Sequence, residues 1–403
     1  MPRIMVYSIV CYVVIILIQQ SCLAALPVND VIELIADRLQ EKQIKTGLYA
    51  GCWPKEYDYT GSIVSGMAKA YDPNCNDAYK NSAELGGDSV FLISQGNFYG
   101  DEAYALTILS RNSADPNDNK WRKALVNFYG NVKNSEGGTE SFIEYSSDDD
   151  RSIDVLYLAQ YVLGAYYADA NDKKIWRRGL ISHLSYVDDT SFFPVMALGA
   201  ALWALSETGP LDNNTPVQSA AGQGSPYWDS KKLSDLPELL MSHQVQDDQP
   251  NDVGSFYWQF THTSESLCGY TEDAVFATLG LAGAYATNPD PNLYGAVIMA
   301  RKALLNGVNP EGRVFEKLSR EGTELYVYSG EMLGVLVELI FPGDIDRDGI
   351  VDKRDFDIIY SRWGEQDCGL SCWCNHADIN RNGVVDILDL GIFCDNWLRE
   401  AGY

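Results

Sequence analysis

Basic residues are scarce in this chain of 403 residues. Lys and Arg together number 30, against 56 Asp and Glu, so the formal net charge is −26. Binding to nucleic acid needs a concentrated basic surface that neutralises phosphates. The chief basic cluster, Lys173-Lys174 with Arg177-Arg178, has the spacing of an amphipathic helix and is typical of its outer face, with an anion site as the alternative. We therefore expect no nucleic acid partner.

The sequence also lacks the motifs of several enzyme classes. It contains no phosphate loop, no dinucleotide-binding glycine fingerprint, no Gly-x-Ser-x-Gly elbow and no His-Glu-x-x-His zinc helix. Nucleotide chemistry and serine hydrolase chemistry are disfavoured. Beyond the N-terminus, no segment is long and apolar enough to span a membrane.

The N-terminus has the three zones of an export signal. Arg3 precedes the apolar run 4–18, and the small residues Ala24 and Ala25 follow a short polar stretch. The pattern predicts a signal peptide over residues 1–25 and a mature protein that is secreted or held at the cell surface. An uncleaved anchor and a lipid attached at the cysteine of position 22 are the alternatives.

Nine cysteines are present, and two of them lie within the predicted signal. Export permits disulfides. Four cysteines cluster near the C-terminus and could form two bridges, although sequence does not give their pairing. These are Cys368, Cys372, Cys374 and Cys394. A zinc site formed by Cys368, Cys372, Cys374 and His376 is the alternative.

Two matching runs rich in Asp, Asn and Gly occupy 344–355 and 378–389. In a calcium loop, oxygens at positions 1, 3, 5, 9 and 12 and a carbonyl at position 7 surround the cation, and Gly at position 6 allows the turn. The first run supplies Asp344, Asp346, Asp348, Ile350, Asp352 and Asp355, with Gly349 at the turn. The second supplies Asp378, Asn380, Asn382, Val384, Asp386 and Asp389, with Gly383 at the turn. The sequence predicts two calcium ions.

The repeated unit is longer than the loop. The second copy begins 34 residues after the first, at 378 instead of 344, and Trp363 and Trp397 recur at the same offset. The repeat therefore consists of a loop and the helix that follows it. A merely solvated acidic tail would not repeat together with its helix.

The duplicated loop and helix, with Asp at position 12, resembles a type I dockerin over 343–398. Dockerins attach secreted polysaccharide-degrading modules to a scaffold that carries cohesins. The resemblance implies calcium binding, a cohesin-like scaffold as partner and a role in polysaccharide breakdown. Positions 10 and 11, where many dockerins place a Ser/Thr pair, hold Lys353 and Arg354 in one copy and Ile387 and Leu388 in the other.

Between the signal and this tail, two kinds of helical segment alternate. One kind is amphipathic and charged, at 30–43, 77–94, 120–133, 173–187, 231–243 and 292–306. The other is apolar and rich in small residues nearly all round, at 61–71, 101–111, 153–167, 192–205, 272–285 and 330–340.

This alternation predicts an inner ring of helices surrounded by an outer ring, because a helix that is apolar on every face must be buried. We expect an all-α chain with an (α/α)6 toroid over 26–340 and a calcium module over 341–403. An open helical solenoid is the alternative. The architecture resembles the six-hairpin toroids of many glycosidases, some polysaccharide lyases and the terpene cyclases.

Aromatic residues concentrate in loops that lead to the starts of the apolar segments, at 51–59, 98–100, 254–258 and 324–328. One end of the ring should therefore collect aromatic rings, on which sugars can stack. Packing around the rim is the alternative explanation.

Carboxylates stand at the same helix starts. Asp101 and Glu102 begin one apolar segment and Glu272 and Asp273 begin another, while a third acidic start covers 148–154. Capping and the helix dipole explain such residues without function, at about 0.3–1 kcal/mol each. The functional interpretation is that two of the four named carboxylates flank a glycosidic bond as acid and base or nucleophile.

Three functions remain open at this point. We expect a glycoside hydrolase that acts on a polysaccharide. A noncatalytic protein for glycan binding or cell-surface assembly is the first alternative. A polysaccharide lyase is the second, with Tyr270, His262 and His183 as its candidate bases. Acidic helix entrances would repel an anionic lyase substrate, so a neutral glycan is favoured.

Overall fold

The computed structural model describes residues 27–113, 115–145, 151–219, 222, 224–246, 252–340, 342–347, 350–368, 373–380 and 382–397. Within these ranges the chain forms fifteen α-helices, and its β-structure is limited to isolated bridges. The all-α prediction is confirmed. The predicted signal peptide lies outside the described residues.

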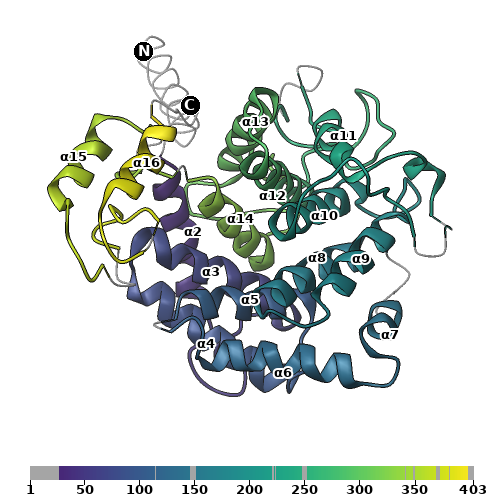
Figure 1. Cartoon of the computed structure of the whole chain (residues 1–403), viewed down its shortest axis with the longest axis horizontal. Coiled ribbons are helices and arrows are strands. Elements are labelled where there is room, and N and C mark those ends of the chain that lie inside the picture. The colour runs from purple at the N-terminus through teal and green to yellow at the C-terminus, as the bar shows by residue number, and fades with distance from the viewer. Residues whose placement is uncertain are drawn as a thin grey trace, which may run out of the picture.

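Six helices form the inner layer of the large helical body. They are α3 (Thr60–Asn74), α5 (Gly100–Arg111), α8 (Arg151–Tyr167), α10 (Pro194–Thr208), α12 (Thr271–Thr287) and α14 (Tyr326–Glu338). Each packs against the next in this order, and α14 packs against α3, so the circuit closes (Figure 1). A six-hairpin toroid requires this cyclic order of contacts, whereas in an open solenoid the last helix would not reach the first.

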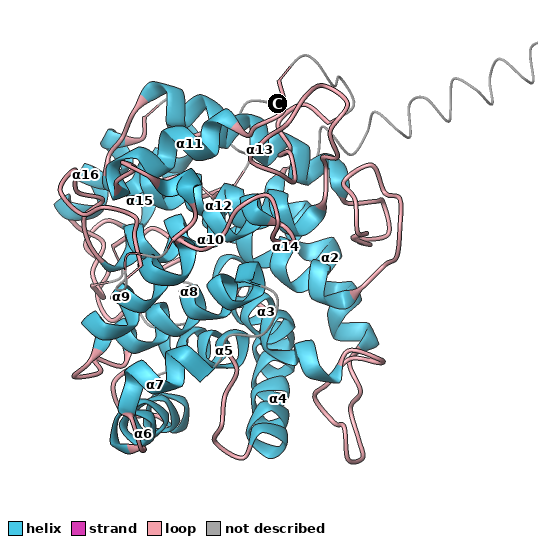
Figure 2. Ribbon diagram, turned by 90° about the vertical axis from the view of Figure 1, so that its right-hand side faces the viewer, coloured by secondary structure: helices cyan, strands magenta, loops and turns pink. Residues whose placement is uncertain are grey.

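Six further helices lie outside this circuit, because each has one charged face (Figure 2). They are α2 (Val28–Lys42), α4 (Asp77–Ser94), α6 (Lys120–Asn134), α9 (Lys173–Leu184), α11 (Leu236–Ser242) and α13 (Pro291–Gly307). The basic cluster at 173–178 begins α9, which buries Trp176 and Leu180 on its other side. Its interpretation as the outer face of an amphipathic helix agrees with this placement.

Two features depart from the predicted pattern. A short helix, α7 (Gly138–Tyr145), stands between α6 and α8, where no helix was expected. The outer helix expected over 231–243 is shorter, because a 3-10 turn (Leu233–Asp235) precedes α11 and Pro237 lies in its first turn. Proline lacks an amide hydrogen, so it is accommodated at a helix start and not in the interior.

Small residues let the inner helices touch backbone to backbone. A Cβ added to Gly199 of α10 would lie 2.5 Å from the backbone nitrogen of Ala277 in α12. Gly280 of α12 faces Gly199 in turn, and Gly66 of α3 faces Gly330 of α14. The small residues noted in the apolar segments therefore stand where neighbouring helices approach most closely.

Side chains fill the axis of the ring partway along the helices. Lys69 of α3 is 6% exposed, and its Nζ lies 2.7 Å from Oε1 of Glu338 in α14. The same ammonium lies 5.3 Å from the ring centre of Tyr104 in α5 and 5.8 Å from that of Trp203 in α10. Since α3 and α10 stand opposite each other in the circuit, these contacts cross the axis.

The C-terminal part has a hydrophobic core of its own. Its helices are α15 (Lys353–Arg362) and α16 (Ile387–Asp395), at the upper left of Figure 1. Val351, Ile359 and Phe393 are buried in a cluster separate from the core of the ring. The two cores lie on either side of the predicted boundary between residues 340 and 341.

A disulfide joins Cys368 and Cys374 in this part. Because a disulfide sulfur is not a thiolate, it removes both residues from the alternative zinc site. Cys394 is a free, exposed thiol, and Cys372 lies outside the described residues.

The backbone contacts of the inner helices make a testable prediction. Gly199→Ala should lower the free energy of unfolding by about 1–3 kcal/mol, because the new methyl group overpacks the contact with Ala277. Gly295→Ala in outer helix α13 is the matched control, since its Cβ meets no atom within 4 Å. That control should stabilise the protein by about 0.5–1 kcal/mol. Urea unfolding measures both, and equal effects would contradict the packing described.

Candidate functional sites

The starts of several inner helices are capped by carboxylates from other segments. Oδ2 of Asp101, in the first turn of α5, accepts a hydrogen bond from the amide of Ser62 in α3 at 3.2 Å. Oδ1 of Asp273, in the first turn of α12, accepts one from the amide of Met196 in α10 at 3.2 Å. The carboxylate of Glu56 accepts from two amides at the start of α14, both at 2.6 Å. These bonds gather acids at the end of the ring where the inner helices begin.

Asp101 and Glu102 are both buried, and their environments differ. Burial raises the pKa of Asp101 to about 6, and amide donors such as Ser62 offset part of the effect. Burial and the neighbouring Asp101 raise the pKa of Glu102 to about 8. Oε2 of Glu102 accepts from the amide of Tyr99 at 2.8 Å, which completes a capping box. Oδ1 of Asp101 is buried and has no hydrogen-bond partner in the described part of the chain.

The two acids of the second predicted pair, Glu272 and Asp273, also lie in different environments. Asp273 is fully buried, and burial followed by the charge of Glu272 raises its pKa. Its contact with Met196 is that of a helix cap. Burial, followed by the charge of Glu316, raises the pKa of Glu272 to about 7. Among the described residues no hydrogen bond holds the Glu272 carboxyl group.

A further carboxylate, Glu331 in the second turn of α14, was not among the predicted site residues. Burial raises its pKa, and the charges of Glu272 and Asp101 raise it further. A hydrogen bond with the Ser62 side chain offsets part of this effect, while Oε2 of Glu331 is buried and has no hydrogen-bond partner among the described residues. Asp101, Glu272 and Glu331 therefore form one group, which we call the mouth acids, contributed by α5, α12 and α14. The available sequence signal was an acid, one of two with Glu338, inside an otherwise apolar segment.

Aromatic rings surround the mouth acids. The phenol of Tyr157 on α8 feels the charges of Asp101 and Glu331, and that of Tyr328 on α14 feels the charge of Glu272. Tyr59 and Tyr99 are exposed at the starts of α3 and α5. Three of the four predicted aromatic loops therefore contribute rings to this end of the ring.

The fourth aromatic loop adds rings at the start of α10 and α12. Trp258 lies 5.3 Å from Phe193 and 6.0 Å from Tyr270 between ring centres. Tyr270 also lies beneath the Lys317 ammonium, at 4.9 Å. Phe192 is 61% exposed, so the cluster presents an aromatic surface to solvent.

The histidines considered for a lyase lie in other surroundings. Nδ1 of His183 lies 3.1 Å from the carbonyl oxygen of Gly179 in its own helix, and burial lowers the pKa of His183. The ring of His262 stacks on Tyr257 at 4.0 Å, and its Nε2 lies 3.3 Å from the carbonyl oxygen of Ser242. The acidic residues 148–150 lie outside the described part of the chain.

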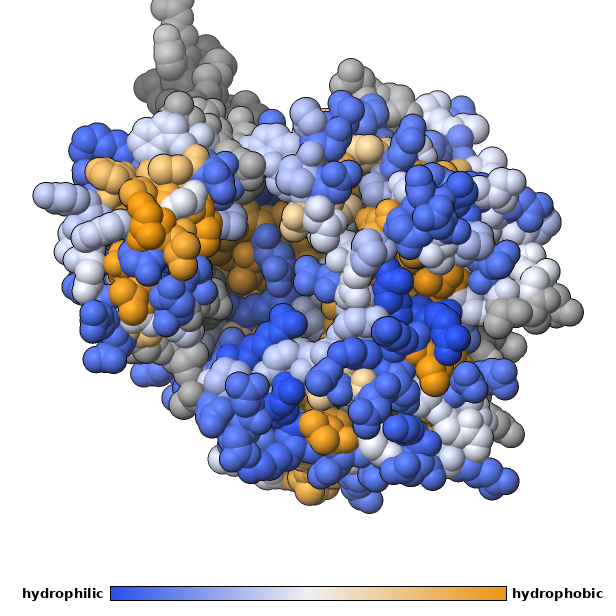
Figure 3. Space-filling view, in the orientation of Figure 1, coloured by the Kyte–Doolittle hydropathy of each residue, from blue (hydrophilic) through white to orange (hydrophobic). Residues whose placement is uncertain are grey.

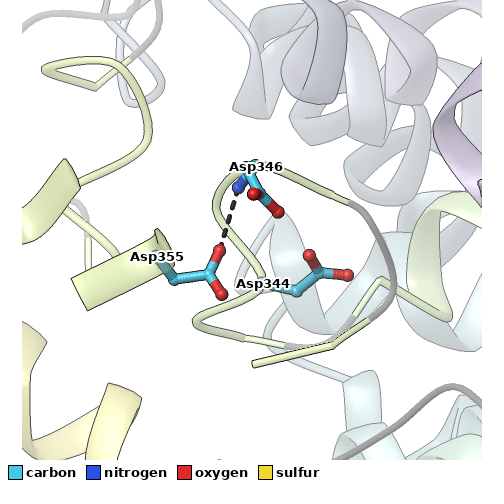
Figure 4. A group of neighbouring side chains, drawn as sticks. All are labelled: Asp344, Asp346 and Asp355. Carbon is cyan, nitrogen blue, oxygen red and sulfur yellow. Dashed lines mark hydrogen bonds between the residues drawn. The ribbon is translucent and has the colours of Figure 1, made fainter. Parts of the chain in front are cut away.

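The first calcium loop brings three of its predicted ligands together. Carboxylate oxygens of Asp344, Asp346 and Asp355 all lie within 4.8 Å of one another (Figure 4). Oδ1 of Asp355 accepts from the amide of Asp346 at 2.9 Å, and its Oδ2 accepts from that of Asp352 at 2.8 Å. Asp348 and Gly349 lie outside the described residues.

The second loop repeats these contacts position by position. Oδ1 of Asp389 accepts from the amide of Asn380 at 3.0 Å, and its Oδ2 accepts from that of Asp386 at 2.8 Å. Gly383 has φ +92°, a conformation that favours glycine, at the turn. Asp378 accepts from two amides across the loop, those of Asn382 and Gly383.

The donor chemistry of both loops fits calcium. Their side-chain donors are carboxylate and amide oxygens, which suit a hard cation and not a soft metal. Asp355 and Asp389 are fully buried, and a divalent cation would offset the cost of burying their charge.

An apolar surface covers the outside of this part of the chain (Figure 3). Its exposed residues are Phe356, Tyr360, Trp363, Ile387, Leu388 and Trp397. Tyr360 is 73% exposed and Ile387 is 65% exposed, so the surface is available to a partner. The predicted Ile387-Leu388 pair at positions 10 and 11 belongs to it.

Comparison with known proteins identifies this part of the chain. The family model of the dockerin type I domain matches residues 342–393. The C-terminus thus carries a type I dockerin module, and such modules bind calcium and cohesin-bearing scaffolds. A dockerin indicates a component of a cellulosome-type, polysaccharide-degrading assembly, typically outside the cell or at its surface. No curated protein sequence matches the chain.

A solved structure, that of the Lin0763 protein from Listeria innocua, matches most of the chain in outline. The match covers 78% of this chain and 96% of that chain, with a TM-score of 0.45 and 9% sequence identity. Similarity at that level supports no conclusion about the fold or the function. In the part of the chain that the structure describes, every helix is too short or too polar to cross a membrane.

Calcium removal should destabilise the dockerin module selectively. A ligand that binds only the folded state stabilises it by about 2.7 kcal/mol at a hundred times its dissociation constant. A chelator should therefore lower the calorimetric transition of the module, and Asp389→Asn should weaken calcium binding by about tenfold or more. Asp395→Asn, on the same helix but outside the loop, is the control. A transition that is insensitive to chelator would contradict calcium binding.

Proposed function

We propose that the helical ring hydrolyses glycosidic bonds in a neutral polysaccharide, as the catalytic part of a secreted protein anchored through its dockerin. In this proposal the ring spans 26–340, the dockerin module spans 341–403 and residues 1–25 are the export signal. The grouping of the mouth acids is the single observation that carries the enzymatic part. Three carboxyl groups from three inner helices interact at an aromatic-lined end of the ring.

The mouth acids differ in a way that suits acid and base roles. After burial, the charge of Glu272 raises the pKa of Glu331, which favours retention of a proton by Glu331. A carboxylic acid that keeps its proton can protonate the departing sugar oxygen. Asp101 receives backbone hydrogen bonds that favour its ionised form, so it can act as the base or the nucleophile.

The surroundings favour a neutral substrate over an anionic one. Three carboxylates and the further acids Glu102 and Asp273 would repel a uronate, whereas sugar hydroxyls can donate to carboxylates. Lys317, beside Tyr270, is a cation near this end of the ring. Its single positive charge is outnumbered by those five acids. A lyase acting on uronans therefore remains the less supported reaction.

The dockerin supplies the attachment in this proposal. We propose that its two loops hold two calcium ions through the twelve predicted positions, and that the apolar surface containing Ile387 and Leu388 faces a cohesin-like scaffold. Calorimetric titration would count the ions.

One observation favours a noncatalytic glycan-binding or surface-assembly protein as the second candidate. Asp101, Asp273 and Glu56 each accept hydrogen bonds from backbone amides of another segment, as purely structural caps do. In that case the aromatic rim would bind glycan without cleaving it.

Substitution of the mouth acids separates the two candidates. Glu331→Gln and Glu272→Gln should each lower kcat by about 10²–10⁴-fold on the cleaved glycan, because each removes a proton-transfer group. Glu265→Gln, an exposed acid outside the mouth, is the control and should retain full activity. Release of reducing ends from a panel of neutral polysaccharides is the readout, with absorbance of unsaturated products as the lyase readout. Wild-type protein that binds but never cleaves any glycan would refute hydrolysis.

The pKa values also predict how activity depends on pH. The base must be ionised, so activity should fall below about pH 6, the pKa of Asp101. The acid must be protonated, so activity should fall above about pH 7, the pKa of Glu272. The profile of kcat/KM should be a bell with its maximum between these values. An activity that keeps rising above pH 8 would contradict this assignment of the acid.

A further inference from the structure

A cavity of about 1020 Å³ lies beside the mouth, between the starts of α5 and α8 and the ends of α4 and α6. Six aromatic residues contribute to its wall, namely Phe98, Tyr99, Phe128, Phe142, Tyr157 and Tyr161. The volume is at the upper end of the range of about 300–1,000 Å³ that is common for small-molecule sites. It can therefore hold a short oligosaccharide.

The aromatic wall is held in place by contacts within the protein. The hydroxyl of Tyr161 donates to the carbonyl oxygen of Phe98 at 2.8 Å. Phe128 stacks on Tyr161 with 5.8 Å between ring centres, and Phe142 meets Tyr161 edge to face at 5.7 Å. A site whose walls are already fixed loses little conformational entropy when a ligand enters.

The polar groups of the cavity are those that recognise sugar hydroxyls. Glu102 and Asp154 lie buried in its wall, at 7% and 5% exposure, and the amides of Asn97 and Asn131 lie exposed at its rim. Carboxylates and amides can each engage two hydroxyl groups. No Lys, Arg or His is among the described residues that line the cavity, so an anionic ligand has no partner there.

The cavity adjoins the mouth acids. Glu102 lines it and directly follows Asp101 in α5, and Tyr157 lines it while its phenol interacts with both Asp101 and Glu331. Tyr99 lies between the cavity and the mouth acids. It is 62% exposed, and its ring centre is 6.2 Å from that of Tyr157. A glycan bound across the mouth can therefore extend into the cavity.

We propose that this cavity is a binding site for neutral sugar units of the substrate, next to the bond that the mouth acids cleave. The role of the bound units in cleavage rests on the proposed function. Their binding does not, since a noncatalytic glycan-binding protein would use the same cavity.

The test obstructs the cavity from its rim. Asn131→Trp places an indole in the opening from an exposed position on α6. Lys133→Trp makes the same change on the same helix, at an exposed residue that does not line the cavity. Asn97→Trp obstructs the opposite rim and serves if Asn131→Trp does not fold, which thermal unfolding would show.

Binding is measured by titration calorimetry with tetrasaccharides of β-1,4-linked glucose, xylose and mannose. We expect at least one to bind the wild type, with affinity lowered about tenfold or more by Asn131→Trp and unchanged by Lys133→Trp. Equal affinity in Asn131→Trp and wild type, or no binding of any tetrasaccharide, would overturn the proposal. The acid variant Glu331→Gln should still bind.

The two proposals fail in different ways. If tetrasaccharide binding is lost in Asn131→Trp while no glycan is cleaved by the wild type, the cavity stands and hydrolysis does not. If the wild type cleaves a glycan and Asn131→Trp has unchanged binding and unchanged KM for it, hydrolysis stands and the cavity proposal falls.

Discussion

Carboxylates that cap the inner helices from neighbouring segments are the contacts on which this end of the ring depends. A helix start leaves amide hydrogens without partners inside the helix, and a ring of six buried helices has little water at hand to satisfy them. Asp101, Asp273 and Glu56 satisfy these amides across the gaps between helices. The carboxylates that cap the inner helices therefore also concentrate acids at the end of the ring where these helices begin.

Some of these capping carboxylates also have oxygens that could take part in a reaction. A carboxylate used only as a cap can direct both oxygens at amides, as Glu56 does at the start of α14. Asp101 uses one oxygen in this way and keeps a buried one unpaired, and Glu331 also keeps an unpaired oxygen close by. Oxygens without partners in a low-dielectric site are those able to exchange protons with a ligand.

Much of the architecture could be predicted from the sequence, because a buried helix is apolar on nearly every face and an outer helix is not. Segments that are apolar all round, such as 272–285, had to be inner helices, and the order of inner and outer helices followed. The positions of Asp101 and Asp273 in first helical turns predicted caps of their own helices, whereas in the structure they also cap α3 and α10. The role of Glu331 was not foreseeable, since the sequence does not show which residues of other helices lie near an acid within an apolar segment. The short helix α7 and the cavity behind it depend on packing between segments and left no periodic signal.

The dockerin module was predictable to the level of individual residues for a different reason. A calcium loop fixes each ligand by its place in a short run, so local sequence contains nearly all of the geometry. The structure adds that Asp355 and Asp389 make equivalent hydrogen bonds in the two copies. It also shows that Cys368 pairs with Cys374, a choice that spacing alone left open.

The buried Lys69 decides how a long polymer can meet this protein. Its ammonium, with Tyr104 and Trp203 from other sides of the ring, occupies the axis between α3 and α10. Under the proposed function, a polysaccharide strand could therefore not pass through the ring along its axis. It would lie across the open face and leave by that face, so that successive cuts along one strand would require sliding or rebinding at the surface.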